Sequence, residues 1–212
     1  MNIDELRLSD PVAAKTGWSP LIFMNISFQS HMLTKDGFGR YAYKPTLVAK
    51  LFPIGIIGLP IYGWRVRSVV NEDLGYPATK ATLPFLDDHG DFDYFICAMF
   101  AIGLFFLCRL NQKTVFDLTK GEYRKRSYIG KTGTHVNLSE IHAIQLLAGK
   151  VNSGTRSART GRRRRSYRTY ELNLVLKNSE RVHVVSSGLL DPLREDASFL
   201  STKLKVPVWR AV

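Results

Sequence analysis

The stretch "YELNLVLKNSERVHVVSS", residues 170–187, decides the fold of the C-terminal half of this chain. Apolar side chains occupy every second position from Tyr170 to Leu176, and again at Val182 and Val184, on either side of the turn-forming "KNSE". Successive side chains of a β-strand point to opposite faces, so this period of two predicts two antiparallel strands that each bury one face.

Further short strands are expected before this pair, and a helix after it. "TVFDL" and "EYRKRSYI" flank a "TKG" turn, and "HVNL" and "EIHAIQLLA" follow a "GKTG" turn. In "DPLREDASFLSTKL" Asp191 is placed as N-cap and Pro192 at the first helical position, and one helical face carries the apolar residues Leu193, Ala197, Leu200 and Leu204. We therefore expect an α+β fold in which six or seven antiparallel strands form a small barrel, closed at one end by the C-terminal helix.

Two apolar runs precede this domain. Leu51 to Trp64 carries no charge and lengthens if Lys50 extends its ammonium toward an interface, and Tyr94 to Cys108 is uncharged over 15 residues. Membrane helices tolerate proline more readily than exposed soluble helices do, and Pro53 and Pro60 lie in the first run. The runs predict a transmembrane hairpin of helices 46–66 and 92–110; the alternative is two core helices of a soluble protein.

The flanks of the runs predict their orientation. The connection 71–93 carries six Asp/Glu against Lys80 alone, whereas Lys and Arg flank the outer ends of both runs. By the positive-inside rule, both termini are cytoplasmic and the acidic loop is external. Arg65 and Arg67 follow the first run on the side predicted to be external, against this rule. A shallow hairpin that does not cross the membrane is therefore an alternative. The predicted organisation is a cytoplasmic segment 1–45 with a β-hairpin turning at Asp36-Gly37, the membrane hairpin 46–110, and a cytoplasmic domain 111–212.

The positive charge is concentrated in the C-terminal half. The formal net charge is +12, and the residues from Arg109 onward hold 21 Lys/Arg against 8 Asp/Glu. The strongest cluster is an arginine-rich loop, 149–168, whose seven arginines are candidate residues for binding a lipid or a partner: Arg156, Arg159, Arg162, Arg163, Arg164, Arg165 and Arg168. A solvated loop, an anionic membrane surface and an acidic protein are all compatible with this run, while nucleic acid is disfavoured because few aromatic residues are interleaved with the arginines.

A resemblance adds to this reading. The succession "TVFDLTKGEYRKR", "VNLSEIHAIQLL" and "YELNLVLKNSERVHVVSSG", followed by a terminal helix and "VPVW", resembles bacterial two-helix membrane proteins with a C-terminal pleckstrin-homology-like (PH-like) domain. The resemblance covers roughly residues 109–212 and rests on structural motifs. It implies a scaffold or lipid-side module at the bacterial cytoplasmic (inner) membrane, without catalysis.

Little in the sequence points to an enzyme. The motifs of serine hydrolases, zinc proteases and P-loop proteins are absent, and no cofactor or metal site is predicted. His135, His142 and His183 lie in different expected strands, and His89 lies in the acidic loop without the spacing of a calcium loop. We expect a non-catalytic, membrane-anchored binding or scaffold protein whose PH-like domain contacts a protein partner or an anionic lipid. The alternatives are an immunity or accessory protein for a secreted toxin or secretion system, and a membrane enzyme.

Overall fold

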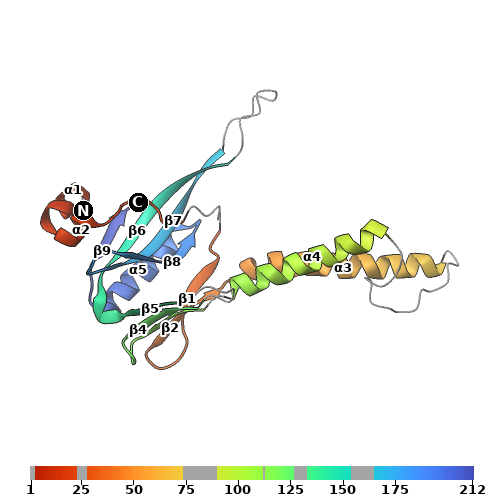
Figure 1. The fold of residues 1–212 in the computed structure, drawn as a ribbon, viewed down its shortest axis with the longest axis horizontal. Coiled ribbons are helices and arrows are strands. Elements are labelled where there is room, and N and C mark those ends of the chain that lie inside the picture. Colours follow the sequence, from red (N-terminus) through yellow and green to blue (C-terminus); the bar gives the residue numbers. More distant parts are fainter. Residues whose placement is uncertain (1–2, 23–27, 74–89, 112, 127–132, 154–164) are drawn as a thin grey trace. The chain divides into compact units, whose positions relative to one another are not determined.

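The computed structural model describes residues 3–22, 28–73, 90–111, 113–126, 133–153 and 165–212 (Figure 1). The chain divides into two compact units. One joins Met1–Thr46 to Lys113–Val212 and is called here the β domain; the other, Leu47–Gln112, is called the helical unit. The helical unit is therefore an insertion between two strands of the β domain.

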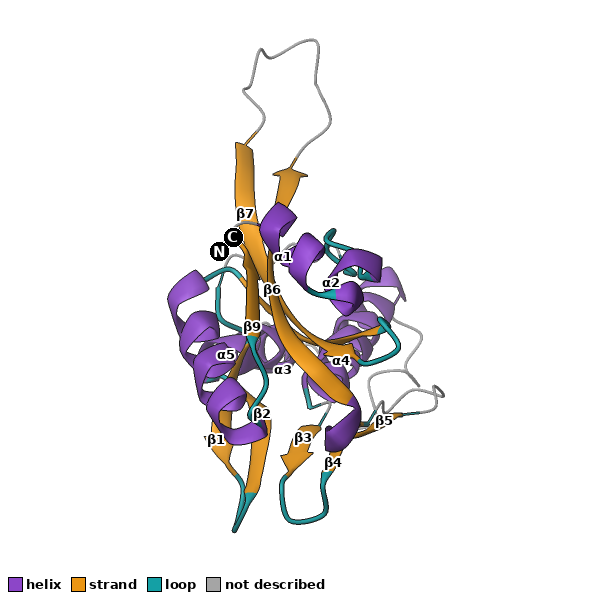
Figure 2. Cartoon of the chain, turned by 90° about the vertical axis from the view of Figure 1, so that its left-hand side faces the viewer, coloured by secondary structure: helices purple, strands orange, loops and turns teal. Residues whose placement is uncertain are grey.

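The β domain contains two sheets (Figures 1 and 2). The five-stranded sheet has the order β1-β2-β3-β4-β5, all antiparallel, with the strands His31–Lys35, Arg40–Pro45, Thr114–Asp117, Glu122–Lys125 and Thr134–Asn137. The four-stranded sheet has the order β8-β7-β6-β9, formed by Arg181–Ser187, Arg165–Leu176, Ile141–Ser153 and Val208–Ala211. Its neighbours are antiparallel except β9, which runs parallel to β6.

The antiparallel sheets and the C-terminal helix confirm the α+β prediction, but the described strands do not close into a barrel. A short 3-10 turn, Leu138–Glu140, leads from β5 into β6, which belongs to the other sheet. β6 cannot pair with β5 to close a barrel, because β7 occupies one of its edges and β9 the other. Near β8, two hydrogen bonds join the sheet to the chain before β1: Ser30 Oγ donates to Ser186 O, and Gly188 N–H donates to Phe28 O.

The main core lies where the inner faces of both sheets meet α5, Leu190–Leu204. It contains Phe116 and Tyr123 from the five-stranded sheet, Leu172 and Leu174 from the four-stranded sheet, and Leu200 from the helix. The predicted apolar face of α5 is confirmed at its buried residues. The predicted N-cap was wrong: the helix begins two residues earlier, at Leu190, so Asp191 lies inside its first turn and Leu189 takes the cap position without a side-chain hydrogen bond.

Two short helices, α1 (Ile3–Ser9) and α2 (Pro11–Lys15), cover the other face of the four-stranded sheet (Figure 2). Leu6 and Ala13 pack there against Ala143, Val175 and Trp209. Asp10 caps α2 by accepting hydrogen bonds from the backbone N–H groups of Val12 and Ala13. Both faces of this sheet are thus buried, which accounts for the unbroken burial of residues 171–176.

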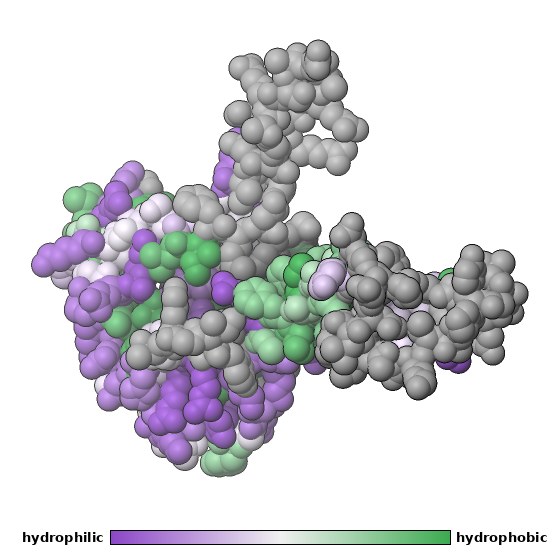
Figure 3. Space-filling model, turned by 45° about the vertical axis from the view of Figure 1, so that its right-hand side comes forward, coloured by the Kyte–Doolittle hydropathy of each residue, from purple (hydrophilic) through white to green (hydrophobic). Residues whose placement is uncertain are grey.

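The helical unit consists of α3, Leu47–Asp73, and α4, Gly90–Leu110, which pack against each other. At Gly103 the approach is close enough that an added Cβ would lie 2.6 Å from Ile57 Cγ1. Apolar side chains remain exposed on both helices and gather on the face shown in Figure 3. Among the described residues, Leu47–Val66 is the one segment long and apolar enough to cross a membrane, and the apolar part of α4, Tyr94–Leu110, is shorter. The expected pair of membrane-spanning helices is therefore supported for one helix only.

Candidate anion-binding site

The outer face of the five-stranded sheet brings together charged side chains from four strands. Tyr123 and Val136 point into the core, so their neighbours Arg124 and His135 point outward. The pairing places Arg124 opposite both Val115 and His135. One step nearer the β3–β4 turn, Asp117 lies opposite Arg40 on β2 and Glu122 on β4.

These side chains line an open hollow of about 540 Å³. Its lining includes six Lys/Arg side chains and two carboxylates, together with His135: the charged residues are Arg40, Lys113, Lys120, Arg124, Lys125, Arg126, Asp117 and Glu122. Positive charge is therefore in excess by four when all six are counted, and by three without Lys125, whose ammonium points into the protein. A concave surface of one sign concentrates the field and attracts ions of the opposite sign.

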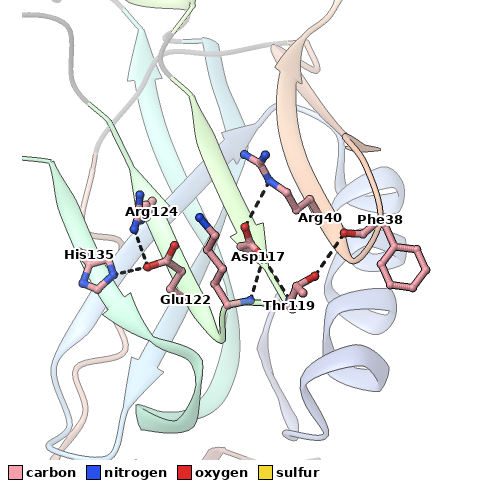
Figure 4. Close-up of polar contacts among 8 residues, drawn as sticks. Phe38, Arg40, Asp117, Thr119, Glu122, Arg124 and His135 are labelled. Atoms are coloured by element: carbon pink, nitrogen blue, oxygen red, sulfur yellow. Dashed lines mark hydrogen bonds and ion pairs between the residues drawn. The ribbon is translucent and has the colours of Figure 1, made fainter.

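Asp117 organises the end of the hollow nearest the β3–β4 turn (Figure 4). Its Oδ1 accepts hydrogen bonds from the backbone N–H groups of Thr119, at 3.1 Å, and Lys120, at 3.0 Å. Its Oδ2 lies 3.4 Å from Arg40 Nε. Asp117 thus shapes the turn and offsets one of the positive charges.

Glu122 holds Arg124, on its own strand, and His135, on the neighbouring strand β5 (Figure 4). Its Oε2 accepts hydrogen bonds of 2.8 Å from His135 Nε2 and from Arg124 Nη2. The hydrogen bond from His135, followed by that from Arg124, keeps the pKa of Glu122 below its usual value. By contrast, Lys113, Lys120 and Arg126 have no ion-pair partner in the part of the chain that the structure describes, and they are the groups best placed to meet an added anion.

Lys125 lies at the base of the hollow, but its ammonium points inward. Nζ donates to the carbonyl oxygens of His183, at 2.9 Å, and Val184, at 3.2 Å, and lies 3.0 Å from His183 Nδ1. Burial lowers the pKa of Lys125 to about 8 and that of His183 to about 3; the nearby Lys125 charge also lowers the latter. Lys125 therefore links β4 of one sheet to β8 of the other rather than serving as a ligand.

The same cluster contains a serine beside a histidine, but the geometry is unsuited to catalysis. Ser186 Oγ lies 2.9 Å from His183 Nε2. A protonated Lys125 has only donors to offer, so His183 Nδ1 must accept, and its proton must be on Nε2. His183 then donates to Ser186 and cannot remove its proton, as a general base would have to do.

The histidines do not converge on a metal site. His135 contacts Glu122, His183 contacts Lys125 and Ser186, and His142 Nε2 lies 2.8 Å from Asp10 Oδ2. Within the described ranges, no group of three or more His, Cys, Asp or Glu side chains could hold a metal ion. His89 lies outside those ranges.

The arginine-rich loop is separate from the hollow as far as the described residues show. Arg168 is exposed on β7, opposite Lys150, and Arg165 is the first residue of that strand. The predicted residues Arg156, Arg159, Arg162, Arg163 and Arg164 lie outside the described residues. The sequence interpretation did not anticipate the hollow, because its cations are dispersed along the chain. The available signal was the spacing of cations two residues apart, as in Arg124 and Arg126, which places them on the same face of a strand.

No known protein family, curated protein or solved structure matches this chain.

Proposed function

We propose that the chain is a non-catalytic, membrane-anchored binding protein whose β domain, a PH-like module, engages anionic lipid headgroups at the cytoplasmic face of the bacterial inner membrane. α3 is its anchor, α4 returns the chain, and both termini are cytoplasmic. The observation that carries the proposal is the hollow on the five-stranded sheet, with its excess of positive charge. Each Lys or Arg near an anionic leaflet contributes about 1 kcal/mol to the attraction before screening.

The exposure of α3 supports the anchor. Only 17% of its most apolar window is buried within the protein. Leu59 and Tyr62 are 67% and 70% exposed. An apolar helix of this length with most of its surface uncovered is suited to hydrocarbon rather than water.

The connections between the units support the location of the binding face. α3 begins directly after Thr46, and Lys113 follows the end of α4 by three residues, which can span at most about 10 Å. In the sheet, Tyr43 lies opposite Thr114, and Arg126 N–H donates to Lys113 O. Lys113 and Arg126 therefore lie at the end of the sheet where the chain enters and leaves the anchor, within reach of headgroups.

The test uses the full chain in mild detergent, with lipid adducts counted by native mass spectrometry. We expect phosphatidylglycerol to bind in preference to phosphatidylcholine, and the double variant Lys113→Glu/Arg126→Glu to lose most of that preference. The matched control, Lys15→Glu/Lys177→Glu, changes the same charge at exposed positions away from the hollow and should retain it. Equal loss in both variants would show a non-specific charge effect, and no preference in the wild type would refute the proposal.

A second prediction concerns the arginine-rich loop and its proposed attraction to anionic lipid. Replacing Arg162, Arg163, Arg164 and Arg165 by alanine is expected to weaken retention on anionic liposomes and to reduce its sensitivity to salt. Unchanged retention over a salt series would assign no lipid role to this loop.

A further inference from the structure

Phe38 is one of the most exposed apolar side chains of the β domain. It is 91% exposed and lies in the turn between β1 and β2. In Figure 4 its ring points away from Asp117 and Arg40. A single exposed apolar residue is common on protein surfaces, so its significance depends on how it is held and on what surrounds it.

The backbone on both sides holds Phe38 in a defined position. Gly37 has φ +135° and Gly39 has φ +64°, conformations that favour glycine. Thr119 Oγ1 donates to Phe38 O at 3.3 Å, and Leu118 N–H donates to Gly39 O at 2.8 Å. A Cβ at Gly39 would lie 2.6 Å from Thr119 Oγ1. The β1–β2 turn is therefore fastened to the β3–β4 turn and presents the phenylalanine outward.

The surroundings of Phe38 are cationic. Arg40 begins β2 two residues after Phe38, Lys120 lies in the joined β3–β4 turn, and both line the anion-binding hollow. The carboxylates nearby are already occupied, because Asp117 contacts Arg40 and Asp36 contacts Lys44 at 2.8 Å. An exposed aromatic ring bordered by cations matches the boundary of an anionic bilayer, where phosphates lie above acyl chains.

We propose that Phe38 inserts into the headgroup–acyl boundary of an anionic bilayer, so that the five-stranded sheet lies with its charged outer face on the membrane. This inference rests on the proposed function, because the charged hollow supplies the attraction that brings the turn to the surface. Phe38 adds an apolar contact and fixes the orientation of the sheet.

The length of β2 bears on the orientation of the sheet. β2 runs from Arg40, beside the Phe38 turn, to Pro45, just before α3, which corresponds to about 17 Å of strand. The anchor connections and the Phe38 turn are at opposite ends of this strand. Both ends can touch one membrane surface only if the strand lies along that surface. The positively charged outer face is the one that an anionic leaflet attracts.

The experiment places an environment-sensitive fluorophore on a single cysteine at position 38 in the full chain, with Cys97 and Cys108 replaced by serine. The protein is reconstituted into vesicles of phosphatidylcholine alone or with phosphatidylglycerol, and quenching by brominated lipid is measured. The matched control labels position 8, because Leu8 on α1 is 89% exposed and equally apolar. In anionic vesicles we expect quenching at position 38 at least about threefold stronger than at position 8.

The outcomes separate this inference from the proposed function. Preferential phosphatidylglycerol adducts together with equal, weak quenching at positions 38 and 8 would overturn the insertion of Phe38 and leave headgroup binding in place. Absence of both adduct preference and quenching would overturn both. Equal quenching at position 38 in neutral and anionic vesicles would also overturn the inference, because attraction by the hollow is part of it.

Discussion

The two sheets of the β domain are built from the same alternation of side chains but differ in what covers them. The four-stranded sheet is packed on one face by the main core and on the other by α1, α2 and Trp18. The five-stranded sheet buries Phe116 and Tyr123 on one face, while its other face carries the charged residues around Arg124. A sheet that is buried on both faces has no face left for a ligand, whereas an antiparallel sheet can keep one face in solvent. The outer face of the five-stranded sheet is therefore the candidate binding surface.

The covering of the four-stranded sheet depends on polar contacts as well as on apolar packing. Glu171 is nearly fully buried, and its carboxylate accepts the backbone N–H groups of Leu21 and Ile22. Gln145 Nε2 donates to Gly17 O, and Arg181 donates to Ser19 O. These contacts fasten the chain after α2 across the sheet and leave that face unavailable to partners.

The largest contrast between the sheets is expected from truncating their apolar side chains. Leu174→Ala should lower the free energy of unfolding by about 2–5 kcal/mol, because the side chain is fully buried and leaves a cavity. Val115→Ala, on the outer face of the five-stranded sheet, should cost about 1 kcal/mol or less. Denaturant unfolding of the full chain in detergent, followed by tryptophan fluorescence, measures both. Similar losses would contradict the difference in covering.

The next largest effect on the free energy of unfolding is expected from removing the link that Lys125 makes between the two sheets. Lys125→Met removes the donor shared by His183 and Val184 and should cost about 1–3 kcal/mol, because buried acceptors are left unpaired. Lys120→Met lies on the same hollow with an exposed side chain and should change stability by about 0.5 kcal/mol or less. The same unfolding experiment compares them; a neutral Lys125→Met would show that the sheets do not depend on this link.

The pH dependence of stability tests the burial of His183. Burial, together with the charge of Lys125, lowers the pKa of His183 from its usual 6.5 to about 3. Between pH 3 and 6.5, His183 therefore binds a proton more readily in the unfolded chain than in the folded one. The contribution of His183 to stability should therefore fall as the pH is lowered from about 6.5 toward 3, and His183→Gln should remove that contribution. Melting temperatures of both proteins across this range measure the difference. Parallel pH profiles would contradict a buried neutral histidine.

The smallest stability effect is expected on the charged face. Glu122→Gln weakens exposed contacts to Arg124 and His135, and exposed ion pairs contribute little to stability because solvent screens them. The substitution also makes the hollow more positive, so phosphatidylglycerol adducts should increase. Glu180→Gln, at an exposed turn of the other sheet, should leave adduct formation unchanged. A fall in adducts for Glu122→Gln would mean that Glu122 positions Arg124 for the ligand.

The parts of the fold that were predicted are those with local sequence signals. Alternation within residues 170–187 identified β7 and β8, and the helical spacing from Leu193 to Leu200 identified α5. The prediction of a closed barrel was wrong, because closure depends on which strands pair and the sequence does not show this pairing. β9 adds to β6 through Val208 to Ala211, a segment too short to show a period. Tyr41 pairs with Phe116 across the inserted helical unit, and no local pattern connects two residues so far apart.

In the candidate site too, the sequence revealed what is local along the chain and missed what depends on strand pairing. The arginine cluster was conspicuous because its residues lie close together in the sequence, whereas the hollow is assembled from single cations on β2, on β4 and in the segments that adjoin β3 and β4. Arg40 reaches the same surface as Asp117 and Glu122 only because β2 pairs with β3 and β3 pairs with β4. A charged surface assembled by strand pairing cannot be read from the spacing of its residues along the chain.

The central claim is that the charged face of the five-stranded sheet lies against anionic lipid. The most direct measurement is the rate at which a water-soluble maleimide labels a cysteine at position 124, compared with one at position 177, in the full chain lacking Cys97 and Cys108 and reconstituted in vesicles. We predict that phosphatidylglycerol slows labelling at position 124 severalfold relative to neutral vesicles and leaves position 177 unchanged. Equal rates at position 124 in neutral and anionic vesicles would contradict the claim.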